Sequence, residues 1–596
     1  MPHLPGSQEP DPGVLGREAD HADPKHQDWR AGGAGFGVSV GTILLRAATQ
    51  EGWHLFAHQD YESRIRGGHN FFQIRLADQP VASWEDDIDI LVALDETTVT
   101  QELGEVKPDG VVIYDPDVLG DAAKELVTKE NCIGLPFARM AEELGQPRIM
   151  ANAVAAGAVW ALLSEEITVL HETLALMFAD KGEAVVAGNQ QVASHGFERV
   201  RGLLGARPRP AKPAKSRPHL VLRGNDALPL GALAAGVKFM SAYPMTPSTG
   251  VTEFIASYGR EAKVIMEQAE DEIAAINMAI GASFTGVRAM TATSGGGFAL
   301  MTEALSLAGS AEIPIVVINA MRPGPSTGLP TRTEQGDLRF AVAMSFGDFP
   351  RAVLAPGDVE EAFYLMAHAF NLAEEYQMPV VVLSDQHLAD SYTTVPPFDL
   401  SKIEIRRGKL AAPEEAGPAY LRHRFTEDGI SPRLYPGFGA GLVVSAGDEH
   451  DEAGHLIEDT ETRRKMMEKR MAKQRLVEDN ALDPVLCGAE DPEIMLIGFG
   501  STKGAIAEAV AVLNSRGCRA QGVHLPQVFP LPRRLGELLQ KPAQKFIVES
   551  NYSGQLEELI ASRFAWKPTG SIRRYDGRPM NAKYILDRLP GGECRG

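Results

Sequence analysis

Apolar residues along this chain stand mostly in short unbroken runs, each closed by a glycine or proline turn and followed by a segment with helical periodicity. In the first third of the chain the runs are at 71–76, 88–94 and 110–115, and an apolar helical segment follows at 151–163. Short strands that alternate with helices are typical of α/β domains. We therefore predict an α/β domain over residues 28–204.

The same alternation returns twice further along the chain. One set of runs includes a strand at 264–267, a strand and glycine turn at 288–297, and a strand at 313–322 that is expected to be fully buried. Another begins with a strand, a glycine turn and an amphipathic helix at 493–510. Two further α/β domains are expected from these patterns.

Two stretches between these domains lack the pattern. The first alternates proline with basic residues, which favours an extended, semi-rigid linker. The second is a connector whose charged run at 461–475 predicts a solvated helix. The expected division is a disordered lead at 1–27, an α/β domain at 28–204, the linker at 205–218, an α/β domain at 219–400, the connector at 401–490 and an α/β domain at 491–596.

The segment at 241–252 closes an apolar run with a fixed turn. Its two prolines stand three positions apart, remove two backbone donors and hold Met245 and Thr246 extended. In an open parallel sheet such a turn lies in the crevice outside the carboxyl ends of the strands, where small molecules bind. The alternative is structural, with Ser248 or Thr249 capping the helix that follows.

The segment at 270–286 is expected to be a helix with one buried face. Its apolar residues recur at helical spacing, at Ile273, Ile276, Ile280 and Phe284. Three acidic residues crowd its first turn, namely Glu270, Asp271 and Glu272. All three suit the positive end of the helix dipole. One of them, if it points into the crevice, is instead available to hydrogen-bond to a ligand or to protonate it.

A strand that is expected to be fully buried ends in an arginine. Arg322 closes the run at 313–322 and is followed by a stiff loop of proline, glycine and hydroxyl residues that carries a second arginine, Arg332. Since the carboxyl ends of parallel strands meet at one edge, Thr246, Gly296 and Arg322 are expected on one rim. Hydroxyls, backbone amides and a guanidinium together suit a small carboxylate.

Two turns near the start of the chain leave two interpretations open. Gly32 to Gly41 leads straight into a helix, as a phosphate-binding turn does, but no apolar strand precedes it, and close backbone packing explains it about as well. The turn at 62–70 packs two arginines, two glycines and a histidine together. It suits either an anion or a solvated set of salt bridges.

Composition narrows the class of protein. The 596 residues carry a formal net charge of -21, which argues against binding to nucleic acid or to an anionic membrane surface. No apolar run reaches the ~18 residues that span a bilayer, and the N-terminus lacks a secretory pattern. The four cysteines are far apart, so neither a disulfide framework nor a four-thiolate iron–sulfur site is expected. These features favour a cytoplasmic protein.

Several of the segments above, in this order, resemble one family. The blocks that carry the resemblance are at 243–249, 270–286, 293–303, 322–338, 425–433, 447–455 and 575–580. They are similar to the α subunit of 2-oxoacid:ferredoxin oxidoreductases, most of all to the 2-oxoglutarate type, and the leading domain resembles the γ part that some members carry fused ahead of α. The resemblance implies several three-layer α/β domains, including a pyrimidine-type thiamine diphosphate domain at 219–400 and a transketolase C-terminal-like domain at 491–596.

The family's cofactor roles are carried over to matching positions. The resemblance assigns Glu272 to the aminopyrimidine ring of thiamine diphosphate, where its carboxyl hydrogen-bonds to the ring nitrogen and promotes the imino tautomer that deprotonates the thiazolium carbon. It assigns Tyr243 and Pro244 to the same cofactor. For the turn at 498–504, simple packing and contact with coenzyme A are both open.

The implied substrate contacts are Thr246, Arg322 and Thr331, with Thr246 and Arg322 counted as catalytic alongside Glu272. An arginine fork grips a carboxylate through two charge-assisted hydrogen bonds, so Arg322 suits the carboxylate next to the reacting carbonyl. The distal carboxylate of 2-oxoglutarate needs a different contact, from Arg332 or from a partner chain.

The resemblance also implies partners. The chain contains no Gly-Asp-Gly motif for Mg²⁺ and diphosphate and no cysteine set for a cluster. A separate β subunit is therefore expected to supply Mg²⁺, diphosphate binding and a [4Fe-4S] cluster, in an (αβ)2 heterotetramer. The implied reaction is the coenzyme A-dependent oxidative decarboxylation of a 2-oxoacid, most simply 2-oxoglutarate to succinyl-CoA, with electrons passed to ferredoxin; the reductive TCA cycle runs this step in reverse.

Three alternatives remain open at the level of the sequence. The first is a subunit of an enzyme for pyruvate or another 2-oxoacid. The second is a lipoyl-using thiamine-dependent dehydrogenase subunit, which would not carry the γ-like domain. The third is a non-enzymatic dinucleotide-binding protein, which would leave the turn at 241–252 and the loop after Arg322 without a role.

Overall fold

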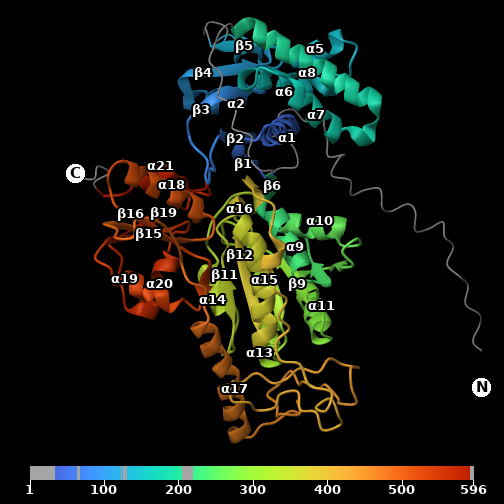
Figure 1. Cartoon of the computed structure of the whole chain (residues 1–596), viewed down its shortest axis with the longest axis vertical. Coiled ribbons are helices and arrows are strands. Elements are labelled where there is room, and N and C mark those ends of the chain that lie inside the picture. Colours follow the sequence, from blue (N-terminus) through green and yellow to red (C-terminus); the bar gives the residue numbers. More distant parts are fainter. Residues whose placement is uncertain are drawn as a thin grey trace, which may run out of the picture.

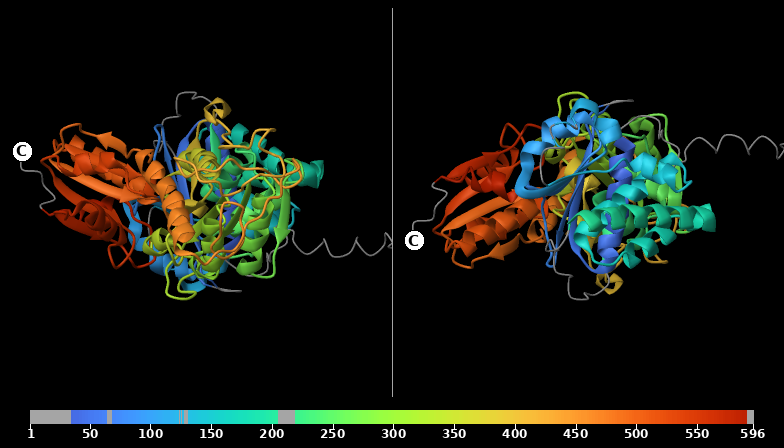
Figure 2. Two further views of the ribbon diagram at one scale, coloured as in Figure 1. Left: turned by 90° about the horizontal axis from the view of Figure 1, so that it is seen from below. Right: turned by 90° about the horizontal axis from the view of Figure 1, so that it is seen from above.

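The computed structural model describes residues 34–63, 68–122, 124, 126, 131–204 and 219–590. An N-terminal domain is stacked on a central domain, with a C-terminal domain beside the central one and a connector at the far end (Figure 1). Along the long axis the N-terminal and central domains overlap, and the C-terminal domain projects to one side (Figure 2). Helices cover the sheets in all three domains, so the predicted α/β class is confirmed.

The strands of the described residues form four sheets. They are β1 (His54–Asp60), β2 (Phe71–Ala77), β3 (Ile88–Ala93), β4 (Val106–Tyr114), β5 (Cys132–Gly134), β6 (Leu220–Arg223), β7 (Phe239–Ala242), β8 (Ile265–Gln268), β9 (Ala289–Thr293), β10 (Ile315–Met321), β11 (Ala352–Leu354), β12 (Pro379–Asp385), β13 (Tyr392–Val395), β14 (Val485–Gly488), β15 (Ile494–Phe499), β16 (Ala520–Leu525), β17 (Gln527–Phe529), β18 (Gln544–Glu549) and β19 (Gly570–Arg573).

The α-helices alternate with these strands. They are α1 (Ala34–Glu51), α2 (Glu96–Glu102), α3 (Pro116–Leu119), α5 (Phe137–Glu143), α6 (Ala151–Leu163), α7 (Thr168–Met177), α8 (Glu183–Leu204), α9 (Gly224–Ala234), α10 (Thr249–Tyr258), α11 (Glu272–Phe284), α12 (Gly295–Leu300), α13 (Thr302–Ser310), α14 (Leu338–Ala343), α15 (Val359–Tyr376), α16 (Gln386–Asp390), α17 (Thr460–Asp479), α18 (Thr502–Ser515), α19 (Arg533–Leu539), α20 (Gln555–Phe564) and α21 (Ala582–Leu586).

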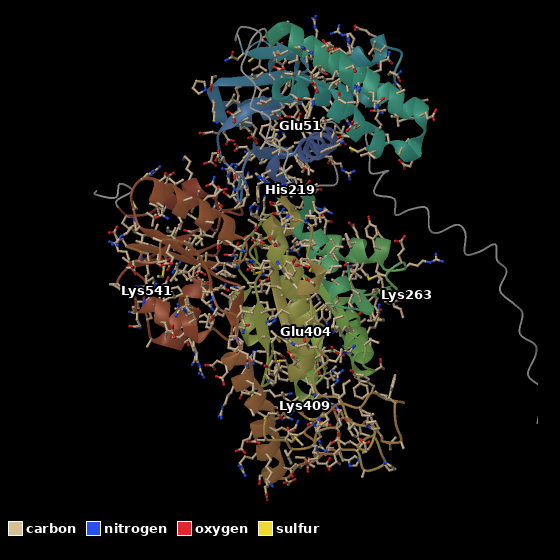
Figure 3. The ribbon with its side chains drawn as sticks, in the orientation of Figure 1. Glu51, His219, Lys263, Glu404, Lys409 and Lys541 are labelled. Carbon is tan, nitrogen blue, oxygen red and sulfur yellow. The ribbon has the colours of Figure 1, made fainter. Side chains whose placement is uncertain are left out.

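One antiparallel sheet joins the N-terminal domain to the central domain. Its order is β2-β1-β13-β6, so strands from both ends of the central segment extend a hairpin of the N-terminal domain. At this junction the rings of His54 and His219 lie 4.4 Å apart, and Figure 3 marks the place by His219. The N-terminal and central segments, which a linker separates in the sequence, therefore contribute strands to one continuous sheet. The linker at 205–218 lies outside the described residues.

The central domain is built on a seven-stranded sheet of order β17-β11-β12-β10-β9-β7-β8. All its strands are parallel apart from β17 at the edge, which runs antiparallel to β11. β10 and β12 are buried along their whole length, as expected of apolar strands between two helical layers. Because β17 belongs to the C-terminal segment, that segment completes the central sheet.

Two smaller sheets complete the fold. The N-terminal domain has a parallel sheet, β3-β4-β5, and the C-terminal domain a sheet of order β14-β16-β15-β18-β19, parallel except for β14. α18 follows β15 through a glycine turn, as the sequence predicts. One core cluster runs from Phe298 in the central domain to Leu556 in the C-terminal domain, so these two domains pack on shared apolar surface.

The glycine run near the N-terminus is helical within the described residues. α1 begins at Ala34, and a Cβ added at Gly41 would lie 2.4 Å from the ring of Phe72. That contact supports the packing interpretation at Gly41. In the turn at 62–70, residues 64–67 lie outside the described ranges, and His69 is hydrogen-bonded to Glu102 at 2.8 Å.

Two expectations about burial are wrong in part. Ile273, expected on the buried face of α11, is 50% exposed, whereas Ile276 and Ile280 are buried. α17 was expected to be solvated, yet Lys469 and Lys473 on one of its faces are buried. The helix is present, but it is not surrounded by solvent.

The buried face of α17 is explained by a carboxylate from the central domain. Glu312 is fully buried and accepts hydrogen bonds from Nζ of Lys469 at 2.5 Å and Nζ of Lys473 at 2.6 Å. Burial opposes ionisation of Glu312, but the two ammonium groups outweigh it and hold its pKa well below the usual value. The connector is thereby tied to the central domain.

Two further observations concern a cysteine and the length of the helices. Cys518 is disulfide-bonded, which the cysteine spacing did not predict. Within the described ranges, no helix combines the length and apolar character needed to cross a bilayer.

Candidate active site

The carboxyl ends of four parallel strands meet at one edge of the central sheet. The segments after β7, β8, β9 and β10 begin at Tyr243, Ala269, Ser294 and Arg322. Because these strands are neighbours in the order β10-β9-β7-β8, the four segments share one rim. This is the arrangement expected from the sequence.

Glu272 is the first residue of α11 and is buried at this rim. Asp271 caps the helix, since its side chain accepts a hydrogen bond from the amide of Ala274 at 2.7 Å. Glu270 is exposed. Glu272 is only 4% exposed, and its Oε1 has no hydrogen-bond partner among the described residues. Of the three acidic residues, Glu272 is the one with a buried carboxyl oxygen that lacks a partner among the described residues.

The glycine turn after β9 packs against this carboxyl. A Cβ at Gly297 would lie 2.6 Å from Oε1 of Glu272 and 2.1 Å from Oγ1 of Thr293, so only glycine fits there. At Gly295 an added Cβ would lie 2.6 Å from Oδ2 of Asp337. The turn thus brings the backbone of α12 against two carboxyl side chains of the rim.

Arg322 and Thr246 are in direct contact across 76 residues of sequence. Nη1 of Arg322 donates to the carbonyl oxygen of Thr246 at 2.6 Å. Burial lowers the pKa of Arg322, and the carboxylate of Asp337 opposes that shift. Tyr243 and Pro244 are exposed on the same turn. Since Thr246 engages one N–H of the guanidinium, the others are available to a carboxylate.

The contacts of Thr331 and Arg332 are with other residues than this pair. Thr331 is 8% exposed and lines a narrow crevice that it shares with Asp60 of the N-terminal domain. Nη1 of Arg332 forms an ion pair with Oδ1 of Asp60. No hydrogen bond in the described ranges links Thr331 to Arg322. Arg332 was one expected source of a contact for a distal carboxylate, but its charge is already paired with Asp60.

Two acidic residues that the sequence did not single out lie in the loop after Arg322, and one of them, Asp337, interacts with the guanidinium. Oδ2 of Asp337 accepts a hydrogen bond from Nδ2 of Asn319 at 3.1 Å, and burial raises the pKa of Asp337. Burial and the nearby Asp337 raise the pKa of Glu334 to about 7. The loop after Arg322 contains both carboxyls, but acidic loop residues are usually solvated, and only the packing of the loop leaves these two half-buried.

The rim leaves several buried polar atoms without partners in the described part of the chain. They include Oε1 of Glu272, Oγ of Ser294 and Oδ1 of Asn319. Buried polar atoms are nearly always hydrogen-bonded, so such a group points to a ligand. An aminopyrimidine ring, with its nitrogens and amino group, fits a buried carboxyl and hydroxyl of this kind. In the described ranges, no three His, Cys, Asp or Glu side chains are grouped as metal ligands.

Models of two protein families match this chain. Residues 230–469 match the thiamine diphosphate-binding domain of pyruvate flavodoxin/ferredoxin oxidoreductases, and residues 29–199 match the pyruvate ferredoxin/flavodoxin oxidoreductase family. The first match covers the rim with Glu272 and Arg322. The second covers the N-terminal domain. The fold and the site therefore define a thiamine diphosphate-type oxidoreductase subunit.

Individual relatives extend over nearly the whole chain. The alpha subunit of 2-oxoacid:ferredoxin oxidoreductase 2 from Aeropyrum pernix is 34% identical over 91% of this chain and 93% of its own length. The 2-oxoglutarate synthase subunit KorA of Methanothermobacter thermautotrophicus is 35% identical over 56% of this chain and 88% of its own. This chain belongs to the 2-oxoacid:ferredoxin oxidoreductase family, and it is similar to the alpha subunits within it.

A solved structure agrees with this assignment. The 2-oxoglutarate:ferredoxin oxidoreductase of Magnetococcus marinus, solved with 2-oxoglutarate, coenzyme A and succinyl-CoA bound, superposes with a TM-score of 0.87. It is 32% identical, and the superposition covers 94% of this chain and 98% of the other. The arrangement of N-terminal, central and C-terminal domains is therefore shared.

Proposed function

We propose that this chain is the α subunit, with a fused γ-like domain, of a 2-oxoglutarate:ferredoxin oxidoreductase. The observation that carries the proposal is the unpartnered Oε1 of Glu272, buried on the same rim as the Arg322–Thr246 contact. The KorA relatives and the substrates named for the Magnetococcus marinus structure favour 2-oxoglutarate over pyruvate. A pyruvate-type enzyme remains the second candidate, since both matching family models carry pyruvate in their descriptions.

In this proposal Glu272 binds the aminopyrimidine ring of thiamine diphosphate through Oε1. Its carboxyl holds a proton against the ring nitrogen, in a site that excludes water because the residue is only 4% exposed. Gly297 lies against the carboxyl, and any side chain at that position would displace it. When bound, the cofactor supplies the electron sink that allows a 2-oxoacid to lose CO₂. Tyr243 completes the cofactor side of the rim.

The proposed substrate residues act by orientation. Arg322 holds the carboxylate next to the reacting carbonyl with its remaining N–H groups, while its bond to Thr246 keeps the guanidinium plane fixed. Thr331 contributes a hydroxyl from the far end of the same loop. Because Asp60 already neutralises Arg332, a contact for the distal carboxylate of 2-oxoglutarate is expected from the β subunit.

The remaining chemistry belongs to partners. A β subunit supplies Mg²⁺, the diphosphate site and a [4Fe-4S] cluster, in an (αβ)2 assembly, and ferredoxin takes the two electrons one at a time. Coenzyme A receives the acyl group as succinyl-CoA. The alpha-subunit names of the relatives support the need for a partner chain.

The test is an assay of this chain purified together with the β subunit that the proposal requires. We expect coenzyme A-dependent reduction of ferredoxin or methyl viologen by 2-oxoglutarate, and much less by pyruvate. Reduction of NAD⁺ through lipoamide, with none of ferredoxin, would contradict the proposal. In the same preparation Arg322→Lys keeps the charge but loses the fork, so KM should rise for both 2-oxoacids. Unchanged kcat/KM for both substrates would remove Arg322 from the substrate site.

A further inference from the structure

An ion-pair cluster connects all three domains next to the predicted substrate loop. The carboxylate of Asp60, at the end of β1, pairs through Oδ1 with Nη1 of Arg332 and through Oδ2 with Nη1 of Arg578. Asp60 comes from the N-terminal domain, Arg332 from the loop after β10 and Arg578 from the C-terminal domain. The side chains of Asp60 and Arg332 are 10% and 19% exposed, so their pair is shielded from solvent, whereas Arg578 is 46% exposed.

The backbone that carries Asp60 is held in place by neighbouring strands and by a hydrogen bond. β1 is paired on both sides, with β2 and with β13, and Asp60 itself pairs with Phe71 in the β1–β2 register. The hydroxyl of the next residue, Tyr61, donates to Oδ2 of Asp390 at 3.1 Å. Since Asp390 belongs to the central domain, the position of Asp60 relative to the rim is fixed by two independent contacts.

The loop is held directly after Thr331. Arg332 is clamped by Asp60, and its Cβ lies 3.2 Å from the place of a Cβ on Gly577, so the side chain packs against that glycine. The amide of Thr333 donates to the carbonyl of Gly577 at 3.2 Å, and its hydroxyl donates to Oδ1 of Asp385 at 3.2 Å. Of these anchors, the pair with Asp60 is the one that depends on the N-terminal domain.

We infer that Asp60 is a positioning residue for substrate binding, which acts through Arg332 to hold the hydroxyl of Thr331 at the substrate site. Thr331 and Asp60 line the same narrow crevice, so a displaced Arg332 would move the neighbouring threonine directly. This role gives the N-terminal domain a function in substrate binding. The inference rests on the proposed role of Thr331 and thus on the proposed function.

The first test uses Asp60→Asn in the complete complex with the β chain. The variant keeps the shape of the side chain but leaves two arginines without a counter-charge, so the loop loses its anchor. We expect KM for the 2-oxoacid to rise roughly fivefold or more, with kcat changed much less. Asp60→Glu should recover part of the loss. Arg332→Met breaks the same pair from the loop side and should raise KM similarly, which keeps the test valid if one variant folds poorly.

The matched control breaks a different contact between the N-terminal and C-terminal domains. Glu508 of α18 accepts two hydrogen bonds from Arg75, each at 2.8 Å, and one from the hydroxyl of Ser83 at 2.6 Å. Glu508→Gln weakens domain anchoring without touching the substrate loop. Its KM should stay near that of the wild type. A rise in KM equal to that of Asp60→Asn would show that Asp60 only anchors a domain, and would overturn the inference.

A double-mutant cycle distinguishes action through Thr331 from other effects. If Asp60 acts through Thr331, then Asp60→Asn adds little to KM in a Thr331→Val background. Fully multiplicative effects would contradict the inference. The outcomes separate it from the proposed function: a wild-type complex inactive with every 2-oxoacid refutes the function, whereas an active complex with unchanged KM in Asp60→Asn refutes only the role of Asp60.

Discussion

Replacement of Glu272 by methionine should stabilise the central domain in the absence of cofactor, although it should abolish turnover. The carboxyl is buried, and its Oε1 has no partner among the described residues. An unpaired buried polar atom costs about 1–3 kcal/mol, which methionine avoids at similar length. The negative charge at the first position of α11 contributes about 0.3–1 kcal/mol through the helix dipole, which is lost. The expected net gain is roughly 0.5–2 kcal/mol.

The measurement must be local because a chain of several domains does not unfold in two states. Amide hydrogen exchange of α11 and β9 in the isolated chain reports the stability of this region. Asp271→Ala is the matched control next door: it removes the helix cap seen on the Ala274 amide and should destabilise α11 by ~1 kcal/mol. In the complex with the β chain, Glu272→Gln should lower turnover by ~10²-fold or more.

Faster exchange in Glu272→Met than in the wild type would refute the reasoning. It would mean that the carboxyl already has a stabilising partner within the chain and is not reserved for a ligand. Unchanged turnover in Glu272→Gln would move the acid–base role to another residue.

Two further predictions concern the neighbours of Glu272 and Arg322. Gly297→Ala should destabilise the chain, since its methyl group would lie 2.1 Å from Oγ1 of Thr293. Gly281→Ala, where a methyl group meets nothing within 4 Å, should stabilise the chain by about 0.5–1 kcal/mol. Thermal unfolding of both variants is the measurement, and equal shifts of the unfolding temperature would contradict the packing argument. Burial raises the pKa of Glu334 in the folded protein from 4.5 to about 7. Between these two pH values the folded state binds this proton more tightly than the unfolded state, so stability falls as the pH rises from 4.5 to about 7. Glu334→Gln should flatten the pH dependence of unfolding there, and an unchanged slope would show that Glu334 is not the titrating group.

The sequence by itself determined the local elements and part of the site. The run at 313–322 became β10 at Ile315–Met321, because a strand buried between two helical layers needs mostly apolar residues. The run at 71–76 became β2, a half-buried strand of the antiparallel sheet. The acidic start of α11 was also readable, although only Glu272 lies in the first turn, because Asp271 is the N-cap and Glu270 precedes it. Which of its carboxyls faces the crevice was not, since capping and ligand binding use the same residue types.

Only the tertiary structure decided which distant charges meet. Asp60 and Arg578 are 518 residues apart, and Lys469 is 157 residues from Glu312. The charged run of α17 looked solvated because a local pattern reports how often a polar residue recurs but not where its counter-charge lies. A buried ion is stable only when an opposite charge reaches it in space, and that partner is supplied by the packing of whole domains. For the same reason Arg332 looked available to a substrate in the sequence, yet in the fold it forms an ion pair with Asp60.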